Sequence, residues 1–375
     1  MSKRILFLTP WYPDDKLPHH GVFVRDQAST LNKDLDVAVI SSKVDYSSFR
    51  LFSWRISEST YEGMKEYRLM VNRSIPLLNQ VNYLLISIWV TYKIGKKFKP
   101  HIIHGNIAYP GGIWAYCTAF LLSCPFVVSD HTSRFTDNFR SAFHRWLTMF
   151  SLRRAGRVIA VSSWAARNIK DVIKRDVEIV PNLIHVDEYA IAHNDQAIAQ
   201  IGFLGGLSSE IHRKGLDILL TAIAPIRDEF VLHIGGQGRF LNYYQDMAMS
   251  LGIGSKCRFH GFVPYVPEFM RNLHFFVSSS RMEAFGMVIA EAMACGLPVI
   301  TTDSGGPADF MDTDCGRMVP VGDVQALRAA IQWMLENYRS FDRNGIRRKV
   351  VNHYSPQAFS TTMQKLYDDL INRRP

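Results

Sequence analysis

The sequence predicts an α/β protein made of two Rossmann-like domains, each built around a parallel β-sheet. Short runs of β-branched and other apolar residues alternate with longer stretches of helical periodicity, which is the pattern of successive βαβ units. The chain has 375 residues, too many for a single core and enough for two domains of ordinary size. With 47% apolar and 21% charged residues, the composition is that of a globular protein.

The first half of the chain contains six candidate strands, several of them followed by a helical pattern. The clearest helical patterns cover residues 21–31, 109–122 and 163–173. The strands are expected at residues 4–8, 36–40, 102–104, 126–129, 157–161 and 178–180. The apolar run of the first strand is too short for the core of a signal peptide, so we interpret it as a buried strand.

The second half repeats this rhythm after a pause in the polar stretch 187–196. We expect helices to begin near residues 214, 239, 267, 286 and 323, and strands at residues 201–204, 230–234, 257–259, 275–278 and 299–301. The pause separates two domains, residues 1–185 and residues 186–355. A last helix, at about 356–372, follows the second domain.

Cysteine use and hydropathy exclude several classes of protein. Five cysteines without a CxxC pair support neither a disulfide framework nor a zinc site, so we expect no metal and a cytoplasmic location. The most apolar stretch, residues 81–92, is interrupted by Asn82 and Ser87 and is shorter than the roughly 20 residues that span a membrane.

The strongest functional motif follows the expected strand at residues 275–278, at the end of the strands where doubly wound sheets bind ligands. Gly286 opens a helix whose first N–H groups could hold a diphosphate. Glu283 precedes it, and Glu291 lies roughly 7.5 Å further along the helix axis, so the two carboxylates could bind hydroxyl groups of a sugar and a ribose. Alternatively, Glu283 is an ordinary carboxylate at a helix start and Glu291 is a solvated helix residue.

The segment from Glu283 to Glu291 resembles the E-x7-E motif of retaining glycosyltransferases of family 4, which have the GT-B fold. The continuation at residues 292–300 and the run Ser-Gly-Gly-Pro at residues 304–307 resemble the same family. The resemblance spans nearly the whole chain and is most specific in residues 201–309.

The resemblance implies a fold and a set of roles. The two domains would face each other across a cleft, with residues 356–375 packing back on the first domain. Glu283 would contact the donor sugar and Glu291 the ribose. Backbone contacts to the sugar and the phosphate would come from Phe285, Gly286, Met287 and Val288.

A second motif, after the expected strand at residues 201–204, resembles the phosphate-binding loop of this family. A fixed cation here would stabilise the charge that develops on a departing nucleoside diphosphate, and Lys214 is the best candidate. The start of a helix is otherwise an electrostatically poor place for a lysine, which favours function over an ordinary surface position. Position 206, where the family often has arginine, is Gly206 here, so Arg213 is the candidate substitute in the donor site.

Residues 11–27, directly after the first expected strand, resemble the acceptor loop of the family. Gly21 would open the first helix beneath the donor phosphates. His19, His20 and Arg25 are assigned to the acceptor or the phosphate, although the two histidines could equally be solvated loop residues. A metal site here would lack a third ligand at matching spacing.

The loop that begins at Ser129 is similar to a loop of the resembling family. In that family, a histidine of this loop contacts the donor sugar across the cleft, and the resemblance assigns this role to His131. His104 and Asn106, at the end of another strand, are assigned to the acceptor pocket. An isolated histidine is more often a structural residue, but the place of His131 in this loop favours function.

Two other signals are weak. The run Gly236-Gln237-Gly238 begins like a dinucleotide fingerprint, but position 241 is Leu241 instead of glycine. The run Asp312-Thr313-Asp314 imitates a metal-binding DxD motif but lies beside a glycine-containing segment that is typical of a turn.

The net charge of +9 is concentrated in one half of the chain. Residues 1–185 carry 25 lysines and arginines against 14 acidic residues, a balance of +11, whereas residues 186–375 carry 18 against 20, a balance of −2. Residues 79–99 resemble an amphipathic helix in which Trp89 and Tyr92 lie near four lysines, a mixture that suits an anionic membrane surface. Alternatively, this segment is a core helix with a lysine-rich exposed end, which consists of Lys93, Lys96, Lys97 and Lys99.

These motifs predict a retaining, metal-independent glycosyltransferase that uses a nucleoside-diphosphate sugar as substrate and needs no cofactor. Its catalytic residues would be Glu283, Lys214 and His131. The acceptor would be a glycan or a lipid-linked hydroxyl compound in bacterial surface-polysaccharide or glycolipid synthesis, met at the inner face of the membrane, and no nucleic-acid partner is expected. The alternatives are a GT-B-fold sugar-nucleotide epimerase and a non-catalytic glycan or nucleotide binder.

Overall fold

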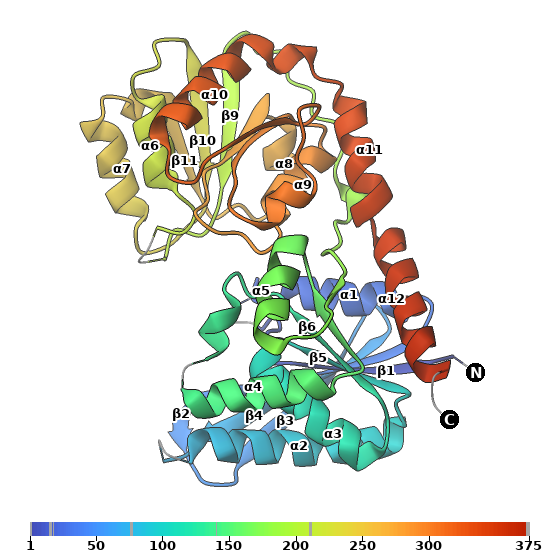
Figure 1. Cartoon of the computed structure of the whole chain (residues 1–375). Helices are drawn as coiled ribbons and strands as arrows, with labels where there is room; N and C mark the ends of the chain where they lie inside the picture. The colour runs from blue at the N-terminus through green and yellow to red at the C-terminus, as the bar shows by residue number, and fades with distance from the viewer. Residues whose placement is uncertain are drawn as a thin grey trace. The chain divides into compact units, whose positions relative to one another are not determined.

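A computed structural model describes residues 2–14, 17, 19–75, 78–139, 141–209 and 212–372 of the chain. The chain divides into two compact units (Figure 1). The first comprises Met1–Leu183 together with Pro356–Pro375, and the second comprises Ile184–Ser355. Each unit has its own sheet, its own helices and its own core.

The first unit contains an eight-stranded sheet with the order β3-β4-β2-β1-β5-β6-β7-β8. Neighbouring strands are parallel, except for the antiparallel pair β3 and β4. The strand order reverses at β1, so the loops after β1 and β5 leave the sheet side by side at its carboxyl edge. The strands are β1 (Arg4–Thr9), β2 (Asp36–Phe49), β3 (Trp54–Tyr61), β4 (Met64–Arg73), β5 (Ile102–Asn106), β6 (Phe126–Asp130), β7 (Arg157–Ala160) and β8 (Glu178–Ile179).

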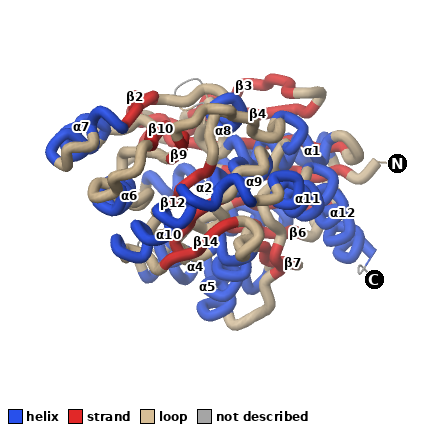
Figure 2. Tube along the Cα trace, turned by 90° about the horizontal axis from the view of Figure 1, so that it is seen from above, coloured by secondary structure: helices blue, strands red, loops and turns tan. Residues whose placement is uncertain are grey.

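Helices cover both faces of this sheet (Figure 1). On one face, α12 lies beside α1 in both views (Figure 1, Figure 2). The apolar residues of α12 recur every three or four positions, so they form a stripe that packs on β1 and α1: Phe359, Met363, Tyr367 and Leu370. The helices of the first unit are α1 (Val22–Asn32), α2 (Asn79–Phe98), α3 (Ile113–Leu122), α4 (Ala142–Arg154), α5 (Ser163–Ile173) and α12 (Pro356–Asn372).

The second unit contains a six-stranded sheet of parallel strands with the order β11-β10-β9-β12-β13-β14. Its strands are β9 (Ala199–Leu204), β10 (Phe230–Gly235), β11 (Cys257–Gly261), β12 (Phe275–Ser278), β13 (Val299–Thr302) and β14 (Gly316–Val319). Its helices are α6 (Leu216–Ile223), α7 (Leu241–Ser250), α8 (Val266–Arg271), α9 (Met287–Ala294), α10 (Val324–Asn337) and α11 (Arg343–Tyr354).

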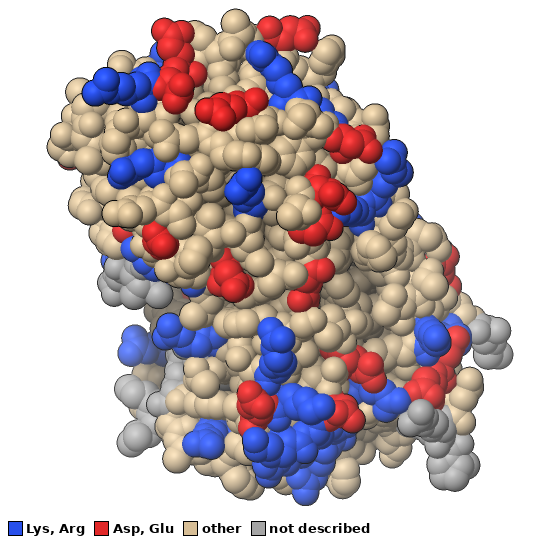
Figure 3. All heavy atoms as spheres, turned by 45° about the horizontal axis from the view of Figure 1, so that its top comes forward, with Lys and Arg blue, Asp and Glu red and all other residues tan. Residues whose placement is uncertain are grey.

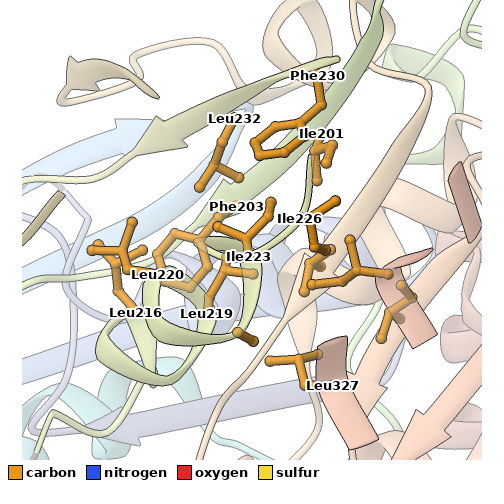
Figure 4. Close-up of a cluster of buried hydrophobic side chains, with 14 of the residues drawn as sticks. Ile201, Phe203, Leu216, Leu219, Leu220, Ile223, Ile226, Phe230, Leu232 and Leu327 are labelled. Atoms are coloured by element: carbon orange, nitrogen blue, oxygen red, sulfur yellow. The ribbon is translucent and has the colours of Figure 1, made fainter. Parts of the chain in front are cut away.

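The core of the second unit lies between its sheet and the helices α6 and α10 (Figure 4). Four of the five leucines and isoleucines of α6 are fully buried: Leu216, Leu219, Leu220 and Ile223. They face the apolar side chains of β9 and β10 (Figure 4). The order of this sheet reverses between β9 and β12, so the loops after these two strands lie at a topological switch point.

The predicted fold class is confirmed, since both units are Rossmann-like, and the predicted strands are present. The sequence did not predict the hairpin of β3 and β4 or the continuation of β2 beyond residue 40. The side chains of β3 are mostly exposed, so this strand lacks the alternation of apolar and polar residues that marks a half-buried strand. Within the described part of the chain, no helix is long and apolar enough to cross a membrane.

Candidate active site

In the second unit, the loops after β9 and β12 are bound to each other at the switch point. The backbone N–H of Arg281 donates to the carbonyl of Arg213 at 2.8 Å. The guanidinium of Arg281 makes two hydrogen bonds to Asp217, of 2.9 and 2.7 Å, and one of 2.7 Å to the carbonyl of His212. The two loops therefore form one rigid wall at the carboxyl edge of the sheet.

Gly215 allows the two loops to approach this closely. It has a positive φ of 67° and precedes α6. A Cβ at this position would lie 1.9 Å from the carbonyl oxygen of Ser279, so no other residue fits without displacing the backbone. The residue before it, Lys214, is held over the end of β12 as a result.

Lys214 forms an ion pair with Glu283, the first glutamate of the predicted motif. Nζ of Lys214 lies 2.6 Å from Oε1 of Glu283, and the hydroxyl of Ser280 donates to the same oxygen at 2.7 Å. The side chains are 18% and 9% exposed. The pair is therefore largely shielded from water. Electrostatic interactions are stronger in such a shielded place than in water.

Two opposing effects act on the pKa of Glu283. Burial raises the pKa, whereas the charge of Lys214 and the hydrogen bonds from Lys214 and Ser280 lower it. The charge of Arg213 adds to the lowering, and the lowering effects prevail. Glu283 is consequently ionised at neutral pH and acts as a hydrogen-bond acceptor.

The backbone of Glu283 is held by the loop after β13. Its N–H donates to the carbonyl of Ser304 at 2.9 Å, and its carbonyl accepts from Gly306 at 2.9 Å. A Cβ on Gly306 would lie 2.3 Å from the carbonyl oxygen of Ala284, so the approach requires glycine. The hydroxyl of Ser304 is buried and has no hydrogen-bond partner within the described residues, which leaves it available to a ligand.

The residues after Glu283 form the turn before α9 and the start of that helix. Gly286 has a φ of 102° and precedes α9, whose first turn begins with the half-buried Met287 and Val288. Phe285 is buried against Phe310, so only its backbone can reach a ligand. The first N–H groups of α9 have no partner within the helix and point outward from its N-terminus. This end of the helix is therefore a suitable anion site.

Glu291 lies on α9 and is half-buried. Burial, followed by the negative charge of the Glu291 carboxylate, raises the pKa of Tyr189, and a hydrogen bond between the two side chains adds to this effect. The sequence offered no signal for Tyr189, because it lies in the polar stretch between the domains. Gly206 is exposed, and a Cβ there would meet no atom within 4 Å, so packing does not require glycine at this position.

In the first unit, Gly21 fits the role of a glycine at a helix start. It has a φ of 76° and precedes α1. A Cβ there would lie 2.4 Å from the carbonyl carbon of Trp11. His19 is exposed, and His20 is half-buried beside Trp11, with ring centroids 5.5 Å apart. The guanidinium of Arg25 lies 4.3 Å above the ring of Tyr61.

His131 lies between two asparagines. Nδ1 is 3.2 Å from Oδ1 of Asn182, and Nε2 is 3.3 Å from Oδ1 of Asn106. Burial lowers the pKa of His131 to about 4, so the ring is neutral at pH 7 and carries a single N–H. Asn182 was not among the residues expected in the site, and its oxygen also accepts from Gln27 at 3.0 Å.

The structure corrects the role expected of His104 and places Asn106 beside His131. His104 is buried, and its ring nitrogens bond to the hydroxyls of Tyr367 at 2.6 Å and Ser129 at 2.7 Å. Burial lowers the pKa of His104 to about 3, so it is a neutral structural residue. Asn106 is also fully buried. Its Oδ1 contacts His131, whereas its Nδ2 has no hydrogen-bond partner within the described residues.

The described residues contain no group of three or more His, Cys, Asp or Glu side chains that could hold a metal ion. The run from Asp312 to Asp314 is a turn, as predicted. Oδ1 of Asp312 accepts from the backbone N–H groups of Asp314 at 3.0 Å and Cys315 at 3.2 Å.

Comparison with known proteins identifies related enzymes. The family model "Glycosyl transferases group 1" matches residues 199–367, and the model "Glycosyltransferase Family 4" matches residues 21–188. An uncharacterized glycosyltransferase of Methanocaldococcus jannaschii is 25% identical over 326 residues, which cover 83% of this chain and 89% of the relative. A phosphatidyl-myo-inositol mannosyltransferase of Mycobacterium leprae is 30% identical over 224 residues, which cover 57% of this chain and 58% of the relative.

A solved structure supports the fold. The structure of Anabaena HepE in complex with UDP and glucose is similar with a TM-score of 0.77 and 17% identity, over 98% of this chain and 100% of that one. The two family models together cover most of both units, and the Glu283–Glu291 motif lies within the first of them. The chain therefore belongs to the GT-B glycosyltransferases of the family 4 type.

Proposed function

We propose that this protein transfers a hexose from a nucleoside-diphosphate sugar to a hydroxyl group, with retention of configuration at the anomeric carbon and without a metal ion. The observation that carries the proposal is the shielded pair of Lys214 and Glu283 at the switch point of the second unit. It combines the two groups that the reaction needs: a cation for the departing diphosphate and a carboxylate for sugar hydroxyls.

A bound donor would replace the ion pair between Lys214 and Glu283 with contacts of its own to each of these residues. A diphosphate at the first turn of α9 would draw Lys214 to its oxygens, and Glu283 would then accept hydrogen bonds from sugar hydroxyls. Arg213 lies near enough to lower the pKa of Glu283 and would add positive charge. Glu291, which Tyr189 orients, would bind the ribose. His131 keeps the role that the resemblance implies, a contact to the donor sugar.

The reaction then needs no separate nucleophile and base. The bond between the anomeric carbon and the diphosphate oxygen breaks, and the acceptor oxygen forms its bond on the same face of the sugar. The acceptor proton passes to the departing phosphate oxygen. Lys214 and the N-terminus of α9 stabilise the charge that develops on this phosphate.

The comparisons support this choice of substrates. Anabaena HepE was solved with UDP and glucose, and the mycobacterial relative is a phosphatidyl-myo-inositol mannosyltransferase. The first of these names fits a nucleoside-diphosphate donor, and the second fits a lipid-linked acceptor. The protein would then act in the assembly of bacterial surface polysaccharides or glycolipids.

A test begins with the donor. UDP-glucose, UDP-galactose, UDP-N-acetylglucosamine and GDP-mannose are screened by thermal shift. A donor at 100 times its Kd should stabilise the protein by about 2.7 kcal/mol, which is roughly 5–10 °C for a domain of this size. With the donor so identified, Glu283→Gln and Lys214→Ala should each lower turnover by about 10² or more.

Lys349→Ala is the matched control, because Lys349 belongs to the same unit and forms its ion pairs with Asp312 and Asp314 and not with Glu283. It should retain turnover. Near-normal turnover in Glu283→Gln or Lys214→Ala would contradict the proposed roles. Incubation with the donor alone distinguishes the alternative enzyme, because an epimerase would convert the nucleotide sugar without an acceptor.

We further propose that the first unit contacts an anionic membrane surface through α2. Trp89 is 47% exposed, and Nζ of Lys93 lies 4.8 Å above its ring. Lys96 lies 5.5 Å above the ring of Tyr92 in the same way. The opposite side of α2 packs into the unit through Tyr83, Ile86 and Val90, so the helix is both a core helix and a carrier of exposed aromatics and lysines.

The charge distribution supports this contact. Residues 1–185 carry a charge balance of +11, and Lys and Arg side chains gather in the lower part of the face that Figure 3 shows. The expected result is cosedimentation with vesicles that contain anionic lipid, reduced by high salt and by changing Lys93, Lys96, Lys97 and Lys99 to Gln. Binding that is indifferent to both changes would contradict the proposal.

A further inference from the structure

A cavity of about 380 Å³ lies within the first unit, at the carboxyl edge of its sheet. Its walls come from four segments: the loop after β1 with Trp11, the far half of β2 with Lys43, the start of α2 with Gln80, and the loop after β5 with Tyr109. His20 completes the wall before α1. Ligand pockets usually measure roughly 300–1,000 Å³, so this cavity has room for a small ligand and not for a long lipid chain.

Four aromatic side chains line the cavity, and several of them are held in place. The hydroxyl of Tyr83 donates to the carbonyl of Ser42 at 3.0 Å. The hydroxyl of Tyr109 donates to Oε1 of Gln80 at 3.0 Å. The turn that carries Trp11 is closed by Thr9, whose hydroxyl contacts the N–H and carbonyl of Trp11 at 3.0 and 2.8 Å. The fourth aromatic residue, at the rim, is Tyr46, which is 69% exposed.

The charges at the cavity are already paired. Lys43 is the one lysine or arginine among the described residues that line it. Its Nζ lies 2.6 Å from Oδ2 of Asp14 and donates to the carbonyl of Tyr12 at 2.7 Å. Burial, followed by the charge of Lys43, lowers the pKa of His20, so this ring is neutral near pH 7. A phosphate or carboxylate ligand would therefore find no unpaired cation in the described lining.

Hydrogen-bonding groups nevertheless remain for a neutral ligand. Nδ1 of His20 is buried without a partner in the described part of the chain. The amide oxygens of Asn79 and Gln80 accept from Ser74 and Tyr109, so their NH₂ groups remain as donors. Fixed aromatic rings beside a few polar groups suit a molecule with one apolar face and hydroxyls around its edge.

We propose that this cavity binds a neutral pyranose ring of the acceptor, with the C–H face of the sugar against Trp11 and its hydroxyls at His20, Asn79 and Gln80. The inference rests on the proposed glycosyl transfer and narrows its acceptor to a compound whose accepting end is an uncharged sugar. The surplus positive charge of the first unit then serves surfaces outside this cavity.

Saturation-transfer NMR tests the proposal on the full-length protein. The probes are the methyl α-glycosides of glucose, galactose and mannose, with sorbitol as a polyol that lacks a ring. At least one glycoside should give a signal that falls about fivefold or more in Trp11→Ala, because the stacking surface is lost. Tyr46→Ala at the exposed rim should lower the same signal without affecting folding.

Trp146→Ala is the matched control, because Trp146 is 57% exposed on α4 and does not line the cavity. It should leave the signal unchanged. A glycoside signal that is equal in the wild type, Trp11→Ala and Tyr46→Ala would overturn the proposal. A glycoside signal that 10 mM inorganic phosphate displaces from the wild type would also overturn the proposal, since the cavity would then prefer an anion.

The donor thermal shift separates this inference from the proposed function. A normal shift and normal turnover in the wild type, without any glycoside signal that depends on Trp11, would refute the cavity assignment and leave the transfer reaction intact. A glycoside signal that depends on Trp11, without any donor shift or turnover, would support the sugar site and refute the proposed reaction.

Discussion

Replacing Lys214 by alanine removes the cation that neutralises Glu283. The change leaves Glu283 with the hydroxyl of Ser280 as a donor at 2.7 Å, but without the ammonium group at 2.6 Å. The carboxylate remains buried under the loop of Ser304 and Gly306, which binds its backbone. A buried charge without its partner is strongly destabilising.

The magnitude follows from the burial of the pair. Removing one partner of a buried pair typically costs about 3–5 kcal/mol. We expect the lower end, about 3 kcal/mol, because the side chain of Lys214 is 18% exposed and water can enter where it was. For a unit the size of Ile184–Ser355, a loss of 1 kcal/mol lowers the Tm by roughly 2–4 °C. The expected decrease in Tm is therefore roughly 6–12 °C.

The sign of the pH dependence makes this prediction specific. In the wild type, the folded protein holds the pKa of Glu283 below the value that this residue has in the unfolded chain. The ionised Glu283 therefore stabilises the protein at a pH above its unfolded pKa. This stabilisation is lost as the pH falls through its folded pKa. Without Lys214, burial dominates and raises the folded pKa above the unfolded one. The variant then suffers most at neutral pH and recovers as the carboxylate becomes protonated. The deficit in Tm should shrink between pH 7.5 and pH 5.0.

The assay is calorimetric unfolding of the wild type, Lys214→Ala, Glu283→Gln and the double variant at both pH values, without donor. Because Glu283→Gln removes the unpaired charge, the double variant should be more stable than the sum of the single changes predicts, by about 2 kcal/mol at pH 7.5. Lys349→Ala controls for the loss of an exposed lysine pair and should cost at most about 1 kcal/mol. A deficit in Lys214→Ala that is no larger than that control, or that is the same at both pH values, would refute the reasoning.

Two further predictions concern the donor. Glu291→Ala should weaken donor binding by about tenfold or more in calorimetric titration, since one buried charged hydrogen bond is worth about 1.5–3 kcal/mol. Turnover at saturating donor should change little. An unchanged Kd would argue against the ribose role. Activity should persist in excess EDTA, because Lys214 and the first turn of α9 can neutralise the diphosphate. Activity that disappears with EDTA and returns with Mg²⁺ or Mn²⁺ would show that this reasoning is wrong.

The sequence by itself determined the elements with a strong apolar period. The buried strands and the amphipathic α12 could be located because their residues alternate or recur at short, regular spacing. The loops that carry Lys214 and Glu283 could be named as candidates because each follows such a strand. The ion pair between them remained hidden, since 69 positions separate the two residues. Their proximity depends on the order β9-β12 in the sheet.

The tertiary structure alone decided which candidates are accessible. His104 ends the predicted strand 102–104, as an acceptor residue could, but in the structure it lies in the middle of β5. Its ring is hydrogen-bonded to Tyr367 of α12, which is 263 positions away in the chain. Four segments form the cavity at Trp11, and only one of them, the loop after β1, contains a motif that the sequence connected with the acceptor. The hydroxyls that orient Glu283 and Glu291 come from Ser280 and Tyr189, which occupy unremarkable positions in the sequence. Local patterns report the conformation of neighbouring residues, whereas burial and pairing depend on contacts between distant segments, and these are established only when the sheets assemble.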